Sequence, residues 1–89
     1  MGEEFVKKGT IRVYGADWCG DCRRARRFFT QHEIQFEWID IDVSDAARAF
    51  VKEVNHGLAS IPTIVFEDGS TMTEPSLPEL EARFHIRPN

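Results

Sequence analysis

Two hydrophobic periods succeed one another along the chain. Residues 10–14 alternate β-branched or aromatic positions with polar ones, and this two-residue period predicts a strand. A three- to four-residue period follows and predicts an amphipathic helix that begins around the two cysteines and runs to about residue 32. Arginines occupy the outer positions of this helix, and its expected inward stripe consists of Ala25, Phe28, Phe29 and His32.

The same alternation continues through the middle of the chain. Residues 35–41 are rich in aromatic and β-branched side chains, which favours a second strand. Ser44 is then suited to cap the N-terminus of a helix, and Gly57 is suited to the left-handed C′ position after its end. The apolar stripe of this helix is expected at Ala47, Phe50, Val51 and Val54.

A hairpin and a last helix complete the pattern. Residues 63–66 and 70–73 predict two strands, and Asp68-Gly69 between them is the signal for a tight type I′ turn. Ser76 opens a capping box with a proline in the first turn, which predicts the start of a helix. The inward stripe of this last helix is expected to contain Leu77, Leu80 and Phe84.

These elements follow the order β-α-β-α-β-β-α, which indicates the α/β class. Strands joined by a helical crossover are parallel, whereas strands joined by a tight hairpin are antiparallel. The simplest architecture is a mixed four-stranded sheet covered by three helices. We expect residues 10–89 to form this single domain, and residues 1–9, which are polar and weakly patterned, to form a loose leader.

Composition and charge narrow the classes of function. The chain has 89 residues, of which 42% are hydrophobic and 29% are charged, as in an ordinary globular protein. Its net charge of −4 provides no general attraction to nucleic acid. No stretch reaches the roughly 18 apolar residues that a membrane span requires, and the N-terminus lacks the apolar segment of a secretory signal. We therefore expect a cytoplasmic monomer without nucleic-acid or membrane partners.

The chain has only two cysteines, and they stand three positions apart in the segment Trp18-Cys-Gly-Asp-Cys22. A small secreted domain held by disulfides usually has four or more. The close pair instead indicates redox chemistry or metal binding. A closed zinc site needs four ligands, and the three histidines stand far apart in the sequence, which disfavours zinc. The pattern also admits a cluster shared between two subunits, or a pair of buried structural cysteines.

The position of the pair at a helix start favours redox chemistry. Unpaired backbone N–H groups and the helix dipole stabilise a thiolate at Cys19. Cys22 lies one helical turn later, close enough for a disulfide, so Cys19 is the expected attacker and Cys22 the resolving thiol. The basic run over residues 23–27 either forms a solvated face or places Arg23 or Arg26 beside the thiolate or an anionic partner.

Pro62 begins the third predicted strand, and two interpretations fit it. A proline is common at a strand start because no ladder hydrogen bond is needed there; alternatively, it is a cis proline beside the cysteines. The cysteine pair after the first strand, Ile61-Pro62-Thr63 before a later strand, and the Asp-Gly hairpin together resemble the glutaredoxins and related redoxins over about residues 10–86. This resemblance implies the thioredoxin-like fold, a cis bond before Pro62, and a binding groove formed by Trp18, Ile61, Pro62 and Thr63.

The resemblance implies a thiol–disulfide oxidoreductase that reduces disulfide-containing proteins or mixed disulfides. No tightly bound cofactor or metal is expected, and the co-substrate would be glutathione or mycothiol. Glutathione-using members usually carry Pro-Tyr between the cysteines, where this chain has Gly20-Asp21, and Asp17 and Asp21 would repel glutathione carboxylates. Residues 68–76 are more similar to the mycoredoxins, relatives that use mycothiol. Two competing functions are a protein-specific reductant recharged by a thioredoxin reductase and an iron–sulfur cluster carrier that binds through Cys19.

Overall fold

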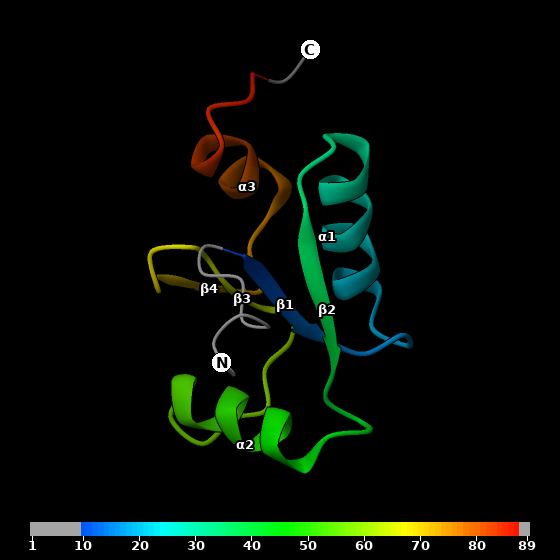
Figure 1. Cartoon of the computed structure of the whole chain (residues 1–89), viewed down its shortest axis with the longest axis vertical. Helices are drawn as coiled ribbons and strands as arrows, with labels where there is room; N and C mark the ends of the chain where they lie inside the picture. Colours follow the sequence, from blue (N-terminus) through cyan, green and yellow to red (C-terminus); the bar gives the residue numbers. More distant parts are fainter. Residues whose placement is uncertain (1–9, 88–89) are drawn as a thin grey trace, which may run out of the picture.

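The computed structural model describes residues 10–87, so the predicted leader over residues 1–9 lies outside the described part. Seven elements follow in the predicted order, which confirms the β-α-β-α-β-β-α pattern. They are β1 (Ile11–Gly15), α1 (Gly20–Gln31), β2 (Phe36–Asp40), α2 (Asp45–Val54), β3 (Thr63–Val65), β4 (Thr71–Thr73) and α3 (Leu77–Arg83). Figure 1 shows their arrangement.

The four strands form one mixed sheet in the order β2-β1-β3-β4. β1 runs parallel to β2, with Val13 opposite Trp38, and antiparallel to β3, with Val13 opposite Ile64. β3 and β4 are the antiparallel arms of the hairpin. The carboxyl end of β1 therefore lies at the centre of the sheet, and the loop that follows it leads directly to the cysteines.

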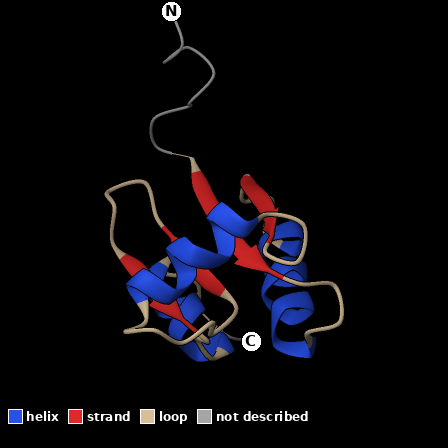
Figure 2. Ribbon diagram, turned by 90° about the horizontal axis from the view of Figure 1, so that it is seen from below, coloured by secondary structure: helices blue, strands red, loops and turns tan. Residues whose placement is uncertain are grey.

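The side chains of the central strands alternate between two hydrophobic cores. Ile11, Val13 and Ile64 pack with α1 and α3 on one face, whereas Tyr14 and Val65 pack with α2 on the other. This is the two-residue period of a sheet that is covered on both faces. Figures 1 and 2 show α2 on the opposite side of the strands from α1 and α3.

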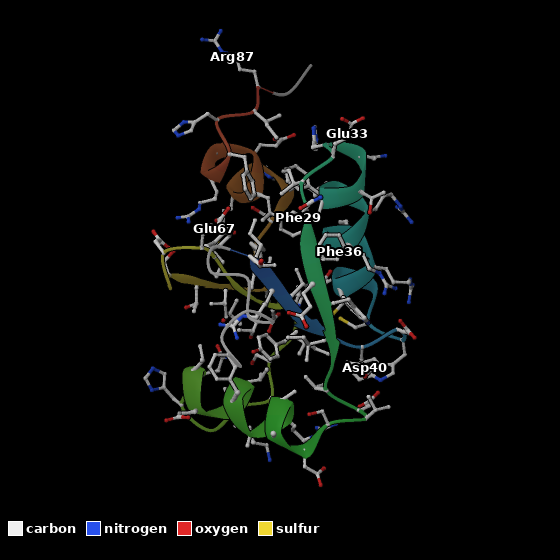
Figure 3. The ribbon with its side chains drawn as sticks, viewed as in Figure 1. Phe29, Glu33, Phe36, Asp40, Glu67 and Arg87 are labelled. Atoms are coloured by element: carbon white, nitrogen blue, oxygen red, sulfur yellow. The ribbon has the colours of Figure 1, made fainter. Side chains whose placement is uncertain are left out.

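Aromatic rings fill the core between α1, β2 and α3. Phe29 is fully buried, and its ring lies beside that of Phe36 (Figure 3), with ring centroids 5.3 Å apart. Its centroid lies 5.7 Å from that of Phe84. Two expected members of the inward stripes lie elsewhere. His32 follows the last residue of α1 and is exposed, with its ring against Phe28. Leu77 is 39% exposed because the first turn of α3 borders a surface cleft rather than the core.

Each helix ends with a left-handed residue directly after its C-cap: Glu33 (φ 55°), His56 (φ 59°) and His85 (φ 58°). After α2, the Gly57 N–H donates to the Lys52 carbonyl at 2.6 Å, which is the Schellman arrangement. The prediction that Gly57 occupies C′ is wrong by one position. Asn55 ends α2 early, with its side-chain amide donating to the Val51 carbonyl, so His56 occupies C′ and Gly57 follows it.

The hairpin turn also differs from the prediction. A type I′ turn needs positive φ at both central residues, but in this turn only Gly69 has positive φ, at 89°. The Gly69 N–H donates to the Phe66 carbonyl, and the Phe66 N–H donates to the Ser70 carbonyl, so the loop is one residue longer than the tight turn. The Asp68 carboxylate accepts hydrogen bonds from the Ser70 N–H and hydroxyl, which stabilises this wider loop.

Candidate active site

Cys19 is the N-cap of α1, a position usually taken by serine, threonine, aspartate or asparagine. Its backbone is extended, and its sulfur accepts a hydrogen bond from the Cys22 N–H at 3.2 Å. Its carbonyl accepts from the Arg23 N–H at 3.0 Å and so begins the helical ladder. The sulfur therefore sits at the positive end of the helix, where negative charge is stabilised.

Cys22 faces the interior and has no exposed surface, whereas Cys19 is partly exposed. Burial, reinforced by a hydrogen bond with the Cys19 side chain, raises the pKa of Cys22 to about 12. Cys22 therefore keeps its proton at neutral pH. The two cysteines are not joined by a disulfide in this structure. The same helical turn thus presents one accessible sulfur with a hydrogen-bond donor and one buried, protonated sulfur.

The loop before β3 approaches Cys19 from across the site. The Ile61–Pro62 bond is cis, as the family resemblance implies. The Ile61 carbonyl oxygen lies 3.9 Å from the Cys19 sulfur, and Pro62 is buried. The Pro62 carbonyl accepts a hydrogen bond from the Glu74 N–H at 2.8 Å, which fastens the loop to the segment after β4.

Asn55 supports the base of this loop through a partly buried polar network that the sequence pattern did not reveal. Its amide nitrogen donates to the Thr63 hydroxyl at 3.0 Å, and its amide oxygen accepts from the Thr73 hydroxyl at 2.7 Å. The Thr63 hydroxyl donates to the Ser60 carbonyl at 2.7 Å. Thr63 is fully buried, so it fixes the loop from inside the domain. The only sequence feature that could have pointed to this network is an asparagine directly after the apolar stripe of α2, and an asparagine in that position indicates no more than a helix end.

Trp18 stands on the outer rim of the site and is 68% exposed. Its indole N–H donates to the Asp42 carboxylate at 2.7 Å, and the same carboxylate accepts from the Arg48 guanidinium at 2.9 Å. Asp42 lies in the loop after β2, and Arg48 lies on α2. The Trp18 ring is therefore held in place at the surface beside Cys19, by residues whose spacing in the sequence gave no sign of this contact.

The acids beside the cysteines are paired with the arginines of α1. Asp17 forms an ion pair with Arg26 at 3.2 Å, and its carbonyl accepts from the Arg23 guanidinium at 2.9 Å. Asp21 forms an ion pair with Arg24. Arg23 and Arg24 are exposed, as expected of a solvated face, and Arg26 is half-buried. Arg24 and Arg26 each pair with a carboxylate, so Asp21 and Asp17 carry less uncompensated charge than the sequence suggested.

A cleft of about 200 Å³ lies between the start of α1 and the segment from β4 to α3. Its charged lining consists of the Asp21, Glu74 and Glu79 carboxylates and the Arg24 guanidinium. Because Arg24 is already paired with Asp21, the cleft retains an excess of negative charge. Among residues 10–87, no three metal-ligating side chains are grouped as a metal site would require. No helix in the same range has the length and apolarity needed to cross a membrane.

The comparisons with known proteins agree with this geometry. A mutant thioredoxin-like protein of known structure superimposes with a TM-score of 0.75 at 25% identity, covering 91% of this chain and 99% of that protein. The fold is therefore thioredoxin-like. The glutaredoxin family model matches residues 11–70, and the chain belongs to the glutaredoxin family.

Two relatives narrow the likeness within that family. A candidate glutaredoxin from Mycobacterium tuberculosis is 40% identical over 73 residues, which cover 82% of this chain and 87% of that protein. Mycoredoxin 1 from Corynebacterium glutamicum is 33% identical over 73 residues, which cover 82% of this chain and 90% of that protein. The chain is thus a glutaredoxin- and mycoredoxin-like protein with two cysteines close together at a helix start.

The raised pKa of Cys22 predicts a loss of stability in alkaline solution. The folded chain holds the Cys22 proton to about pH 12, whereas an unperturbed thiol loses it near pH 9. The contribution of this bound proton to the free energy of unfolding is fully present below pH 9. It is lost as the pH rises toward 12, by roughly 1 kcal/mol per pH unit. Above pH 9, the free energy of unfolding measured in urea should therefore fall more steeply with pH for the reduced chain than for the Cys22→Ala variant. Parallel declines would contradict the raised pKa.

Proposed function

We propose that the protein is a thiol–disulfide oxidoreductase in which Cys19 attacks and Cys22 resolves. The observation that carries the proposal is the difference between the two sulfurs. Cys19 is accessible and accepts the Cys22 N–H at the helix terminus, whereas Cys22 is buried and protonated. A sulfur in the first environment is the better nucleophile, because thiolates rather than thiols attack disulfides.

The proposed reaction proceeds in two exchanges. The Cys19 thiolate attacks one sulfur of the substrate disulfide, forms a mixed disulfide and releases the other substrate sulfur as a thiolate, which takes up a proton. Cys22 then gives up its proton and attacks the Cys19 sulfur. This step forms the Cys19–Cys22 disulfide and releases the second substrate thiol. The substrate gains two electrons and two protons, and an external thiol reductant must return the enzyme to its dithiol form.

The groove for the substrate is proposed to run between Trp18 and the Ile61–Pro62 loop. The partly exposed Cys19 sulfur lies between these elements, 3.9 Å from the Ile61 carbonyl. Trp18 offers an exposed ring on one side, which suits the side chains around a protein disulfide. In this proposal Pro62 and Thr63 contribute by fixing the loop from within, since both are buried.

A low-molecular-weight thiol without carboxylates, of the mycothiol type, is the co-substrate we favour over glutathione. The cleft beside the helix start is lined by Asp21, Glu74 and Glu79 and by one cation, Arg24, which pairs with Asp21, so its excess of negative charge comes from Glu74 and Glu79. Glutathione would bring two carboxylates toward that charge, whereas the sugar-based mycothiol has none. The match to mycoredoxin 1 supports the same choice. A thioredoxin reductase is the competing electron donor, and turnover with it can be measured beside turnover with the two thiols.

Cys19→Ser should abolish reduction of a protein disulfide, because the attacking sulfur is gone. Cys22→Ser should instead accumulate a mixed disulfide between Cys19 and the substrate, because no resolving thiol displaces it. Non-reducing mass spectrometry of each variant with an oxidised protein substrate measures both outcomes. If Cys22→Ser yields no adduct and Cys19→Ser does, the two roles are reversed.

Neutralising the cleft should improve the use of glutathione. Asp21→Asn and Glu74→Gln should each raise turnover with glutathione about threefold, since removing one exposed like charge improves the interaction free energy with glutathione by less than about 1 kcal/mol. The control is Glu53→Gln on the exposed surface of α2, which should change nothing. Rates are measured in parallel with glutathione, mycothiol and thioredoxin reductase. Unchanged glutathione rates, or no turnover with mycothiol, would contradict this choice of thiol.

A further inference from the structure

The end of β1 leaves room for two side chains because residue 15 is glycine. The Gly15 backbone is fixed by the parallel ladder, and its carbonyl accepts from the Ile41 N–H at 3.0 Å. A Cβ at this position would lie 2.7 Å from Cη2 of Trp38 and 2.8 Å from the Cys22 sulfur. Both distances are shorter than real Cβ contacts allow. The Trp38 ring edge and the Cys22 sulfur therefore share the space that any larger residue would fill.

Trp38 is itself held in position from the other side. It lies on β2 and packs against the core under α1. The Arg26 guanidinium carbon lies 4.0 Å from the centroid of the Trp38 ring, in a cation–π arrangement. The same guanidinium pairs with Asp17 at 3.2 Å, two positions before Cys19. Contacts thus lead from Asp17 in the active-site loop through Arg26 to Trp38, and the Trp38 ring edge borders the same space beside Gly15 as the Cys22 sulfur.

We propose that Trp38 is a positioning residue for the resolving step, with its ring closing the back of the Cys22 site and keeping that sulfur directed at Cys19. The inference rests on the proposed function, because it assigns the ring to the second exchange of that reaction. Cys22 has no exposed surface, and its sulfur and the Trp38 ring edge both border the position that a Cβ on Gly15 would occupy. In this proposal Arg26 acts indirectly, by holding the Trp38 ring in place. Gly15 contributes because it has no side chain to displace the ring or the sulfur.

Loss of the ring has a defined consequence for the disulfide. Without it the Cys22 sulfur gains space and access to water, so it spends less time in the geometry that attacks Cys19. Small displacements of a reacting group reduce effective concentration by as much as a hundredfold. The first exchange uses only the Cys19 sulfur and its helix-terminus donor, so that step is unaffected.

The test compares Trp38→Leu and Trp38→Phe with the control Glu37→Gln, which changes the exposed neighbouring residue on β2. In a Cys19→Ser background, the rate at which iodoacetamide alkylates Cys22 at pH 8 should rise about tenfold for Trp38→Leu and less for Trp38→Phe. In the dithiol chain, the equilibrium constant for forming the Cys19–Cys22 disulfide against oxidised dithiothreitol should fall by a similar factor. Circular dichroism confirms that each variant is folded. Unchanged alkylation and an unchanged equilibrium in folded variants would overturn the proposal.

Gly15→Ala supplies an independent arm that does not depend on removing the ring. It should also expose Cys22 to alkylation, and its effect should be smaller when Trp38→Leu is already present, because the two residues occupy adjoining space. If Gly15→Ala changed Cys22 alkylation equally with and without Trp38→Leu, the two residues would not act through a shared space. The attack of Cys19 on a disulfide is measured separately in Cys22→Ser. If that attack fails while Cys22 alkylation still depends on Trp38, the proposed function is wrong, but Trp38 does shield the Cys22 sulfur.

Discussion

Cys19 caps α1 with its sulfur, which accepts the Cys22 N–H at 3.2 Å while its own carbonyl starts the helical ladder. One turn of helix thus makes the two cysteines chemically different, since the first sulfur meets an unpaired donor at the helix terminus and the second is turned into the core. The central position of β1 in the sheet is what delivers the chain to this point.

The surrounding contacts fall into two groups by the sulfur they serve. The Ile61–Pro62 loop and Trp18 border the accessible sulfur, and each is tied down from a distance, the loop by the Asn55 network and the ring by Asp42. Gly15 and Trp38 border the buried sulfur instead. Because these contacts come from β1, β2, α2 and β4, the difference between the cysteines depends on the whole tertiary structure rather than on the motif alone.

Local pattern predicted the elements, the sheet type and the place of the cysteines, because each depends on hydrophobic period, capping and turn residues within a few positions. It failed where side-chain hydrogen bonds and tertiary contacts decide the outcome. The turn around Asp68 is wider than the tight turn, and hydrogen bonds from Ser70 to the Asp68 carboxylate stabilise it. α2 ends one residue early, where the Asn55 side chain donates to the Val51 carbonyl and to the Thr63 hydroxyl of β3. The Gly15–Trp38 contact joins residues more than twenty positions apart, and nothing in either local segment announces it.

The central claim is that folding alone makes Cys19 the reactive thiol and Cys22 the protected one. It is tested most directly by treating the reduced, unmodified chain at pH 7 with less than one equivalent of iodoacetamide and mapping the label by peptide mass spectrometry. We expect nearly all of the label on Cys19, and about equal labelling of the two cysteines once the chain is unfolded in urea. Substantial labelling of Cys22 in the folded chain, or the same preference in the unfolded chain, would contradict the claim.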